Sequence, residues 1–127
     1  MTGRIILAAL AAGIMQAGAA LAGAQSYICA FDQRCGASRG CGATELSMIF
    51  HFDDATGAAF VIGNNGVAEV QAIRGPAADS FVEPLPNGAV QVTVIDLANL
   101  RAAHSRHPVL EGGLVPSQYY GACTAGN

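Results

Sequence analysis

The sequence predicts an all-β domain of about eight antiparallel strands in up-and-down order, forming a small barrel or sandwich. Turn-forming residues recur about every ten residues after Cys41, which is typical of such folds. Several segments between the turns alternate apolar and polar residues, as strands with one buried face do. The chain also contains four cysteines, so we expect two disulfides to hold the domain together.

Residues 1–24 have the pattern of a signal peptide. Arg4 supplies a positive start, residues 5–15 are apolar or small, and Ala22-Gly23-Ala24 forms a small-x-small cleavage site. We expect cleavage after Ala24, which leaves a single β domain over residues 25–127 in the periplasm or outside the cell. The alternative is an uncleaved anchor, because the apolar stretch is nearly long enough to span a bilayer. After cleavage we expect no membrane span.

The predicted strands follow one another with short connections. Turns are expected where Asn-Gly or Gly-Gly accepts a positive φ at low cost, as at Asn65-Gly66, Asn87-Gly88 and Gly112-Gly113. Short connections favour up-and-down order, and about eight strands can close into a barrel without free edges. The expected strands are 27–31, 45–53, 58–63, 67–74, 80–85, 89–96, 100–110 and 114–124.

Alternation predicts which side chains of two strands share a face. Because alternation means that one face is buried and the other is wet, we expect the apolar face of each strand in the core. The apolar residues are Leu46, Met48, Phe50 and Phe52 in segment 45–53, and Val90, Val92 and Val94, opposite Gln91 and Thr93, in segment 89–96.

Of the three possible cysteine pairings, we expect Cys29–Cys123 with Cys35–Cys41. Cys29 lies in the first predicted strand and Cys123 in the last, so their bond would tie the two ends of the domain together. Cys35 and Cys41 flank a flexible segment that is easily closed. The alternative is a metal site formed by Cys29, Cys35 and Cys41 with a histidine, but zinc sites usually show two close pairs of ligands. We therefore expect neither a metal nor another cofactor.

The charge of the domain excludes one class of partner. All nine acidic residues and five of the six basic residues lie after residue 24, so this part of the chain is net negative. It contains no lysine and no basic run. Binding to a phosphate backbone requires clustered positive charge, so we do not expect nucleic acid as a partner.

The densest polar stretch, His104 to His107, is the candidate binding site. With Gly112-Gly113 as a two-residue turn, it would pair with the segment that follows Pro116. Arg106 would then lie opposite Tyr119. Side chains alternate along a strand, which divides the candidates between two faces. His104, Arg106 and Tyr119 share one face, and Ser105, His107, Gln118 and Tyr120 share the other.

Each face has a structural and a functional interpretation. The first is either an arginine stacked on a tyrosine at the wet surface or a small anion site, and as a recognition surface it would have Arg106 and Tyr119 exposed. If the face is structural instead, we expect Arg106 inside the barrel and paired with an acid. The second is either a hydrogen-bonded polar patch in or at the rim of the barrel, or a Ser105 nucleophile activated by His107. A Ser–His pair also needs an orienting acid and oxyanion donors, and the sequence identifies neither.

Residues at both ends of the domain resemble those of a known group. Tyr27-x-Cys29 begins the domain, and Ser105-Arg106-His107 followed by Pro116-Ser117-Gln118-Tyr119-Tyr120-Gly121-x-Cys123 ends it. The pattern looks like that of small exported proteins of Gram-negative bacteria, which implies export and a β domain but no particular activity.

A second and more distant similarity concerns the expected architecture. An exported eight-stranded barrel with a cysteine near each end is similar to the periplasmic inhibitors of C-type lysozyme. Those inhibitors insert a Ser-Gly loop and a basic residue into the lysozyme cleft. This chain has no Ser-Gly dipeptide and no lysine, so no residue role is transferred from them.

These observations favour a non-enzymatic, exported binding or interaction module whose partner is a protein or a small ligand. The alternatives are an inhibitor of a cell-wall hydrolase and a small hydrolase that uses Ser105 and His107. The candidate binding residues are His104, Arg106, Tyr119, His107, Gln118 and Tyr120.

Overall fold

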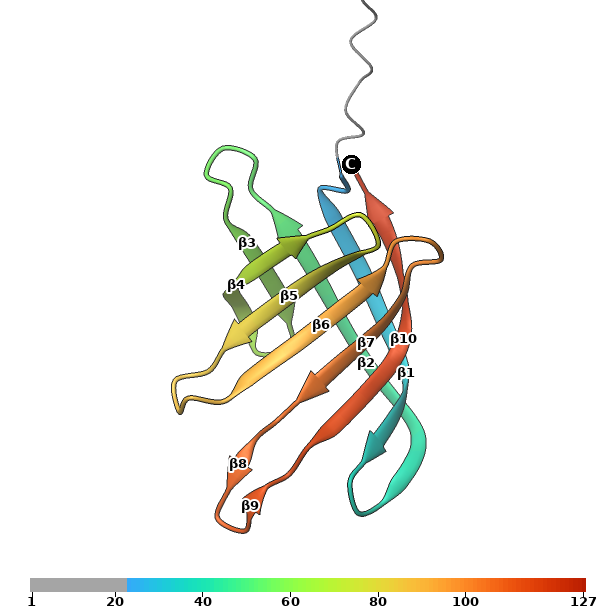
Figure 1. Ribbon diagram of the computed structural model, residues 1–127, viewed down its shortest axis with the longest axis vertical. Coiled ribbons are helices and arrows are strands. Elements are labelled where there is room, and N and C mark those ends of the chain that lie inside the picture. The colour runs from blue at the N-terminus through green and yellow to red at the C-terminus, as the bar shows by residue number, and fades with distance from the viewer. Residues whose placement is uncertain (1–22) are drawn as a thin grey trace, which may run out of the picture.

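The computed structural model describes residues 23–127, so the predicted signal peptide, apart from its last two residues, lies outside the described residues. The described part is all-β, with ten strands and no helix (Figure 1). It accordingly contains no helix long and apolar enough to cross a membrane. The strands are β1 (Ser26–Gly36), β2 (Gly40–Phe52), β3 (Ala59–Gly63), β4 (Gly66–Arg74), β5 (Ala78–Pro84), β6 (Val90–Asp96), β7 (Arg101–Arg106), β8 (Val109–Leu110), β9 (Gly113–Leu114) and β10 (Ser117–Gly126).

Eight of these strands form a closed antiparallel barrel in the order β1-β10-β7-β6-β5-β4-β3-β2. The closing pair is β1 and β10. All other neighbouring barrel strands follow one another along the chain, with only the β8–β9 hairpin between β7 and β10, which confirms the predicted up-and-down order. The predicted strand 100–110 is divided into β7 and β8, and 114–124 into β9 and β10. The short strands β8 and β9 form a separate hairpin between β7 and β10 that projects from the bottom of the barrel in Figure 1.

Both predicted disulfides are present. Cys29 and Cys123 lie directly opposite each other on β1 and β10, so their bond joins the first and last strands where the barrel closes. Cys35 and Cys41 lie opposite each other on β1 and β2. Two disulfides in so small a domain fit an oxidising environment outside the cytoplasm.

The core is built from inward-facing aromatic and aliphatic side chains. As predicted for β2, Met48 and Phe50 are buried, and Phe50 stacks on Phe81 of β5 with ring centroids 4.3 Å apart. The largest fully buried side chains are Tyr27, Phe31, Phe50, Phe81 and Ile95.

The predicted face of β6 is wrong. Thr93 and Ile95 point into the barrel, whereas Val90 and Val94 are 37% and 40% exposed on the outside. Alternation identifies the residues that share a face, but the partner strands determine which face lies inside. Here the polar face can be buried because the Thr93 hydroxyl finds a hydrogen-bond partner in the interior, His104.

A polar cluster lies at the upper end of the barrel, where β1 begins and β10 ends. The Tyr27 hydroxyl donates to the buried Asp79 carboxylate at 2.6 Å, and Arg74 Nε lies 3.4 Å from the same carboxylate. Burial and the hydrogen bond to Asp79 raise the pKa of Tyr27 to about 12. The Arg74 guanidinium also covers the ring of Phe52. Tyr27, Arg74 and Asp79 therefore satisfy one another's polar groups.

Candidate functional site

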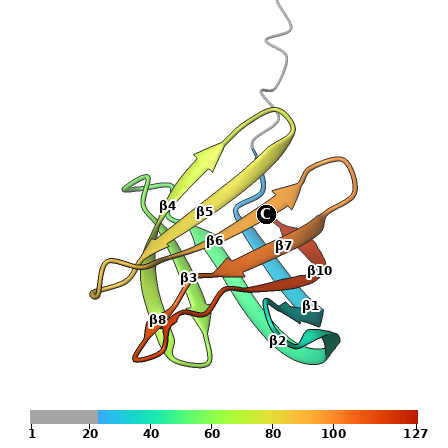
Figure 2. The same ribbon diagram turned by 60° about the horizontal axis from the view of Figure 1, so that its bottom comes forward.

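The opposite end, here called the lower mouth, carries the β1–β2, β3–β4, β5–β6 and β8–β9 turns (Figure 2). Its interior-facing residues are more polar than those of the core. They come from the ends of strands that pair around the barrel, so the register between β7 and β10 decides which of the sequence candidates meet here.

The predicted register of β7 and β10 is wrong by two residues. Leu110 pairs with Gly113, so the turn residues are Glu111 and Gly112 rather than Gly112 and Gly113. The positive φ of 104° falls on Gly113, after the two turn residues. Tyr119 consequently lies opposite His104 rather than Arg106. A shift of two residues returns each side chain to the same face, so the predicted grouping of His104, Arg106 and Tyr119 still holds.

This face lies inside the barrel and not at the wet surface, as the structural alternative expects, but Arg106 is not paired with an acid there. His104 is 2% exposed and Tyr119 is 8% exposed. Arg106 is half-buried at the end of β7, where the interior opens at the lower mouth. The three side chains therefore line the interior of the barrel at its lower mouth and do not form an outer surface.

A chain of contacts holds the Arg106 guanidinium in place. Its Nε donates to Nε2 of His104 at 3.1 Å, and its central carbon lies 4.9 Å from the centre of the Tyr119 ring. Because Nε2 accepts this hydrogen bond, the imidazole proton sits on Nδ1, which lies 2.7 Å from the Thr93 hydroxyl. Burial, followed by the charge of Arg106, lowers the pKa of His104 to about 4, so the ring is neutral near pH 7.

A second arginine shares the Tyr119 ring. The guanidinium carbon of Arg34, on β1, lies 5.7 Å from the ring centre. Within residues 23–127, the only ion pair joins Arg74 to Asp79, so neither Arg34 nor Arg106 has a carboxylate within 4.0 Å. Two cations therefore meet at one tyrosine at the lower mouth of a net acidic domain.

The first hollow at the mouth, here called the notch, lies beside Arg106 and has a volume of about 330 Å³. It forms because β2 pairs with β3 only from Ile49 to Phe52, and the chain then turns back at the β3–β4 turn, which leaves the wall short. The notch is lined by Leu46, Ser47 and Met48 of β2, the 63–68 turn region, Val61, Glu83, Gln91 and Arg106.

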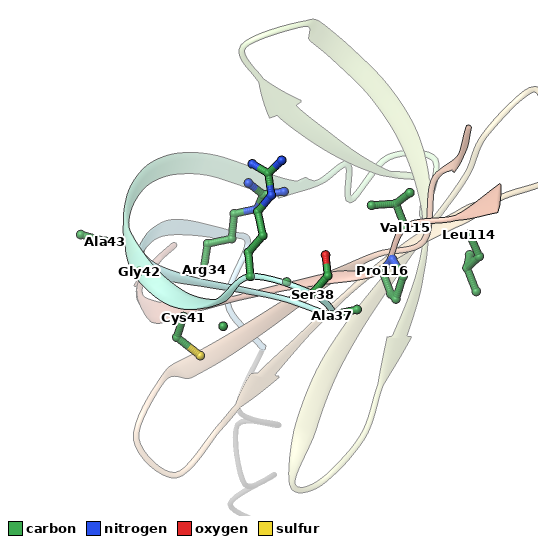
Figure 3. Close-up of a pocket in the computed structure, with 12 residues that line it drawn as sticks. Arg34, Ala37, Ser38, Cys41, Gly42, Ala43, Leu114, Val115 and Pro116 are labelled. Atoms are coloured by element: carbon green, nitrogen blue, oxygen red, sulfur yellow. The ribbon is translucent and has the colours of Figure 1, made fainter. Parts of the chain in front are cut away.

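The second hollow, here called the hairpin cleft, has a volume of about 670 Å³. One side is the β1–β2 turn with Arg34 and Ser38, and the other is the segment Leu114-Val115-Pro116 (Figure 3). Arg34 lines the cleft and Arg106 lines the notch, so the arginines that share Tyr119 belong to different hollows.

The remaining sequence candidates line neither of these two hollows. Gln118 and Tyr120 face outward from β10, and the Tyr120 hydroxyl donates to the Gln118 side chain. His107 lies past the end of β7, with Nδ1 3.4 Å from the carbonyl oxygen of Val90. Among the described side chains, no hydrogen bond joins Ser105 to His107. No group of three or more His, Cys, Asp or Glu side chains in residues 23–127 is placed to hold a metal ion.

Sequence reasoning missed the residues that complete the site: Arg34, Glu83, Gln91 and Thr93. Gln91 and Thr93 alternate with valines, and only the pairing of β6 with its neighbours places them inside. Arg34 reaches Tyr119 because the register between β1 and β10 shifts between Phe31 and Gln33, and no local pattern in the sequence reveals this shift.

No family model, curated protein or solved structure matches this chain. The geometry of the lower mouth is therefore the basis for the functional argument.

Proposed function

We propose that this protein is an exported, non-enzymatic binding module that holds a small anionic ligand in the notch. The supporting observation is the state of Arg106. Its guanidinium is half-buried, is fixed by His104 and Tyr119, and has no carboxylate within 4.0 Å in the described part of the chain. A fixed cation that lines a hollow and is not paired with a carboxylate is suited to an anionic group from outside.

The hydrogen-bond pattern leaves the binding end of Arg106 available. Nε is used by His104, which leaves the terminal N–H groups to bind a carboxylate or phosphate in bidentate fashion. His104 is neutral near pH 7 and does not compete for the anion. Its role is to orient the guanidinium.

The other walls of the notch restrict the ligand further. Glu83 can accept a hydrogen bond from a ligand hydroxyl or amine, and Gln91 can donate or accept one. Glu83 also disfavours a ligand with several negative charges. A volume of about 330 Å³ suits a molecule of monosaccharide size. The ligand we expect carries one acidic group together with hydroxyl or amine donors.

Titration followed by amide NMR tests the proposal. We would add acetate, inorganic phosphate and glucuronate to the domain spanning residues 25–127, and expect glucuronate to bind best, with shifts centred on Gln91 and Arg106. Arg106→Gln should abolish the response. Arg101→Gln removes an exposed arginine from the other end of the same strand and should not.

Equal responses in both variants would mean that the anion binds elsewhere. If the protein instead inhibits C-type lysozyme and does not respond to these anions, the inhibitor function suggested by the similarity replaces this proposal. An ester-hydrolysis screen with Ser105→Ala as control addresses the hydrolase alternative.

A further inference from the structure

The hairpin cleft has a different chemistry from the notch. We propose that it binds an extended acidic segment of a partner protein, with carboxylates on Arg34 and Arg39 and apolar side chains against Leu114 and Val115. This inference does not depend on the ligand of the notch, because the two hollows share no lining residue.

One wall of the cleft is cationic. Arg34 and Arg39 both line it, both are exposed, and neither has a carboxylate within 4.0 Å in the part of the chain that the structure describes. Arg34 is steadied by the ring of Tyr119 at 5.7 Å, so its guanidinium is partly ordered before a partner arrives. In Figure 3 the Ser38 hydroxyl lies on the same side as the Arg34 guanidinium, where it adds a neutral donor and acceptor.

The opposite wall is apolar and uncovered. Leu114 and Val115 are 63% and 44% exposed, and Val109 and Leu110 on the same hairpin are also exposed. Isolated exposed aliphatic residues are common, but Leu114 and Val115 are neighbours that both line the cleft, opposite two arginines. Interfaces between proteins typically combine an apolar centre with arginine at contacts of high affinity.

The lining of the cleft includes three glycines. Gly36, Gly40 and Gly42 line it, and a Cβ atom built on any of them would meet no atom within 4 Å. A peptide main chain can therefore approach this surface closely. The volume of about 670 Å³ accommodates a few side chains of an extended segment.

The geometry favours a protein segment over an anionic membrane. The cleft is a hollow between two hairpins, and a hollow suits an inserted chain better than a flat lipid surface. Glu111 lies in the turn at the tip of the β8–β9 hairpin, where an anionic membrane would repel it.

Binding of designed peptides tests the inference. We would label a capped octapeptide of alternating leucine and glutamate and follow fluorescence anisotropy, with glutamine and lysine versions as charge controls. The glutamate peptide should bind saturably, the glutamine peptide about tenfold more weakly, and the lysine peptide not at all. Amide shifts should map to residues 34–42 and 114–116.

Two variants and a matched control locate the contact. Arg39→Gln should weaken binding of the glutamate peptide about tenfold, and Val115→Asp should abolish it. Both positions are exposed, so thermal unfolding should confirm that each variant is folded. Arg101→Gln removes an equal charge at the far end of the barrel and should bind as the parent does. Arg39→Gln should leave the response to glucuronate unchanged, which separates this inference from the proposed function.

The inference is overturned if the glutamate peptide shows no saturable binding at millimolar concentration, or if it binds Arg39→Gln as tightly as the parent. It is also overturned if the peptide fails while phosphatidylglycerol vesicles sediment the parent protein and not Arg39→Gln, because that result assigns the cleft to a membrane.

Discussion

Gly121 occupies a position where the neighbouring backbone leaves no room for a side chain. It lies on β10 opposite Phe31, and a Cβ atom at this position would lie 2.0 Å from the carbonyl oxygen of Ala30. We expect Gly121→Ala to destabilise the protein by about 3 kcal/mol, the upper range for overpacking, since backbone rather than a flexible side chain must move. Gly36→Ala is the matched control, because its new methyl group meets nothing within 4 Å. Urea unfolding of the two variants measures the difference, and similar midpoints would show that β1 and β10 can separate at little cost.

His104 makes stability depend on pH in a defined window. Its pKa is lowered from 6.5 to about 4 in the folded protein, so the unfolded chain binds more protons between these values. The neutral ring contributes fully to the free energy of unfolding above pH 6.5, and this contribution is lost as the pH falls to about 4. We expect the free energy of unfolding to fall by about 3 kcal/mol over this pH range.

Unfolding of parent and variants at several pH values checks this expectation. His104→Gln should flatten the dependence between pH 4 and 6.5, whereas His51→Gln removes an exposed histidine of β2 and should not. A slope that survives in His104→Gln would have to come from other groups, such as the acidic residues.

At the scale of the element, β6 shows that a buried polar side chain in a small barrel needs a partner on a neighbouring strand. Thr93→Val keeps the shape of the side chain but leaves Nδ1 of the buried His104 without its partner. We expect a cost of about 1–3 kcal/mol, the penalty for an unsatisfied buried polar group. Val94→Thr makes the reverse change on the outer face, and we expect it to stay within about 0.5 kcal/mol. Equal thermal shifts in the two variants would contradict the assignment of the faces.

The strands and the turns between them could be predicted from sequence because their signals are local. Asn65-Gly66 and Asn87-Gly88 do connect neighbouring strands, and Cys29 and Cys123 do lie on the first and last strands. The same reasoning failed wherever the answer depended on a distant strand. The inward face of β6 is set by its neighbours, and its buried threonine is acceptable only because β7 supplies His104.

The candidate site was predicted in part for the same reason. Periodicity correctly grouped His104, Arg106 and Tyr119, because the grouping survives a register error of two residues. It could not place that face inside the barrel, since burial follows from closure. Periodicity also could not predict the contact between Arg34 and Tyr119, because it joins two strands that are far apart in the sequence.

At the scale of the whole molecule, the two disulfides differ in what they enclose. Cys29 and Cys123 are separated by 94 residues, and Cys35 and Cys41 by 6. In the chain-entropy model the first bond contributes about 4.7 kcal/mol and the second about 2 kcal/mol. We therefore expect the double variant Cys29→Ala with Cys123→Ala to unfold at a much lower urea concentration than Cys35→Ala with Cys41→Ala. The opposite order would mean that the β1–β2 hairpin, and not the closing pair, limits stability.

Gln25, the first residue of the expected mature chain, is held by backbone hydrogen bonds at the end of the barrel where β1 begins. The Gln25 amide donates to the carbonyl of Gly126, and the Gln25 carbonyl accepts from the amide of Phe52. We predict that protein recovered from the periplasm begins at Gln25, which intact-mass measurement decides. A mass that retains residues 1–24 would instead support the anchored alternative.

The position of Tyr119 has an optical consequence. The chain has three tyrosines and no tryptophan, so its ultraviolet emission comes from tyrosine alone. Tyr27 donates to a carboxylate, an arrangement that quenches emission, whereas the ring of Tyr119 faces the guanidinium groups of Arg34 and Arg106. An anion drawn to either arginine changes the electric field across that ring. Tyr119 thus places a fluorophore between the two hollows, and we expect occupancy of either to change the tyrosine emission above a constant contribution from Tyr120.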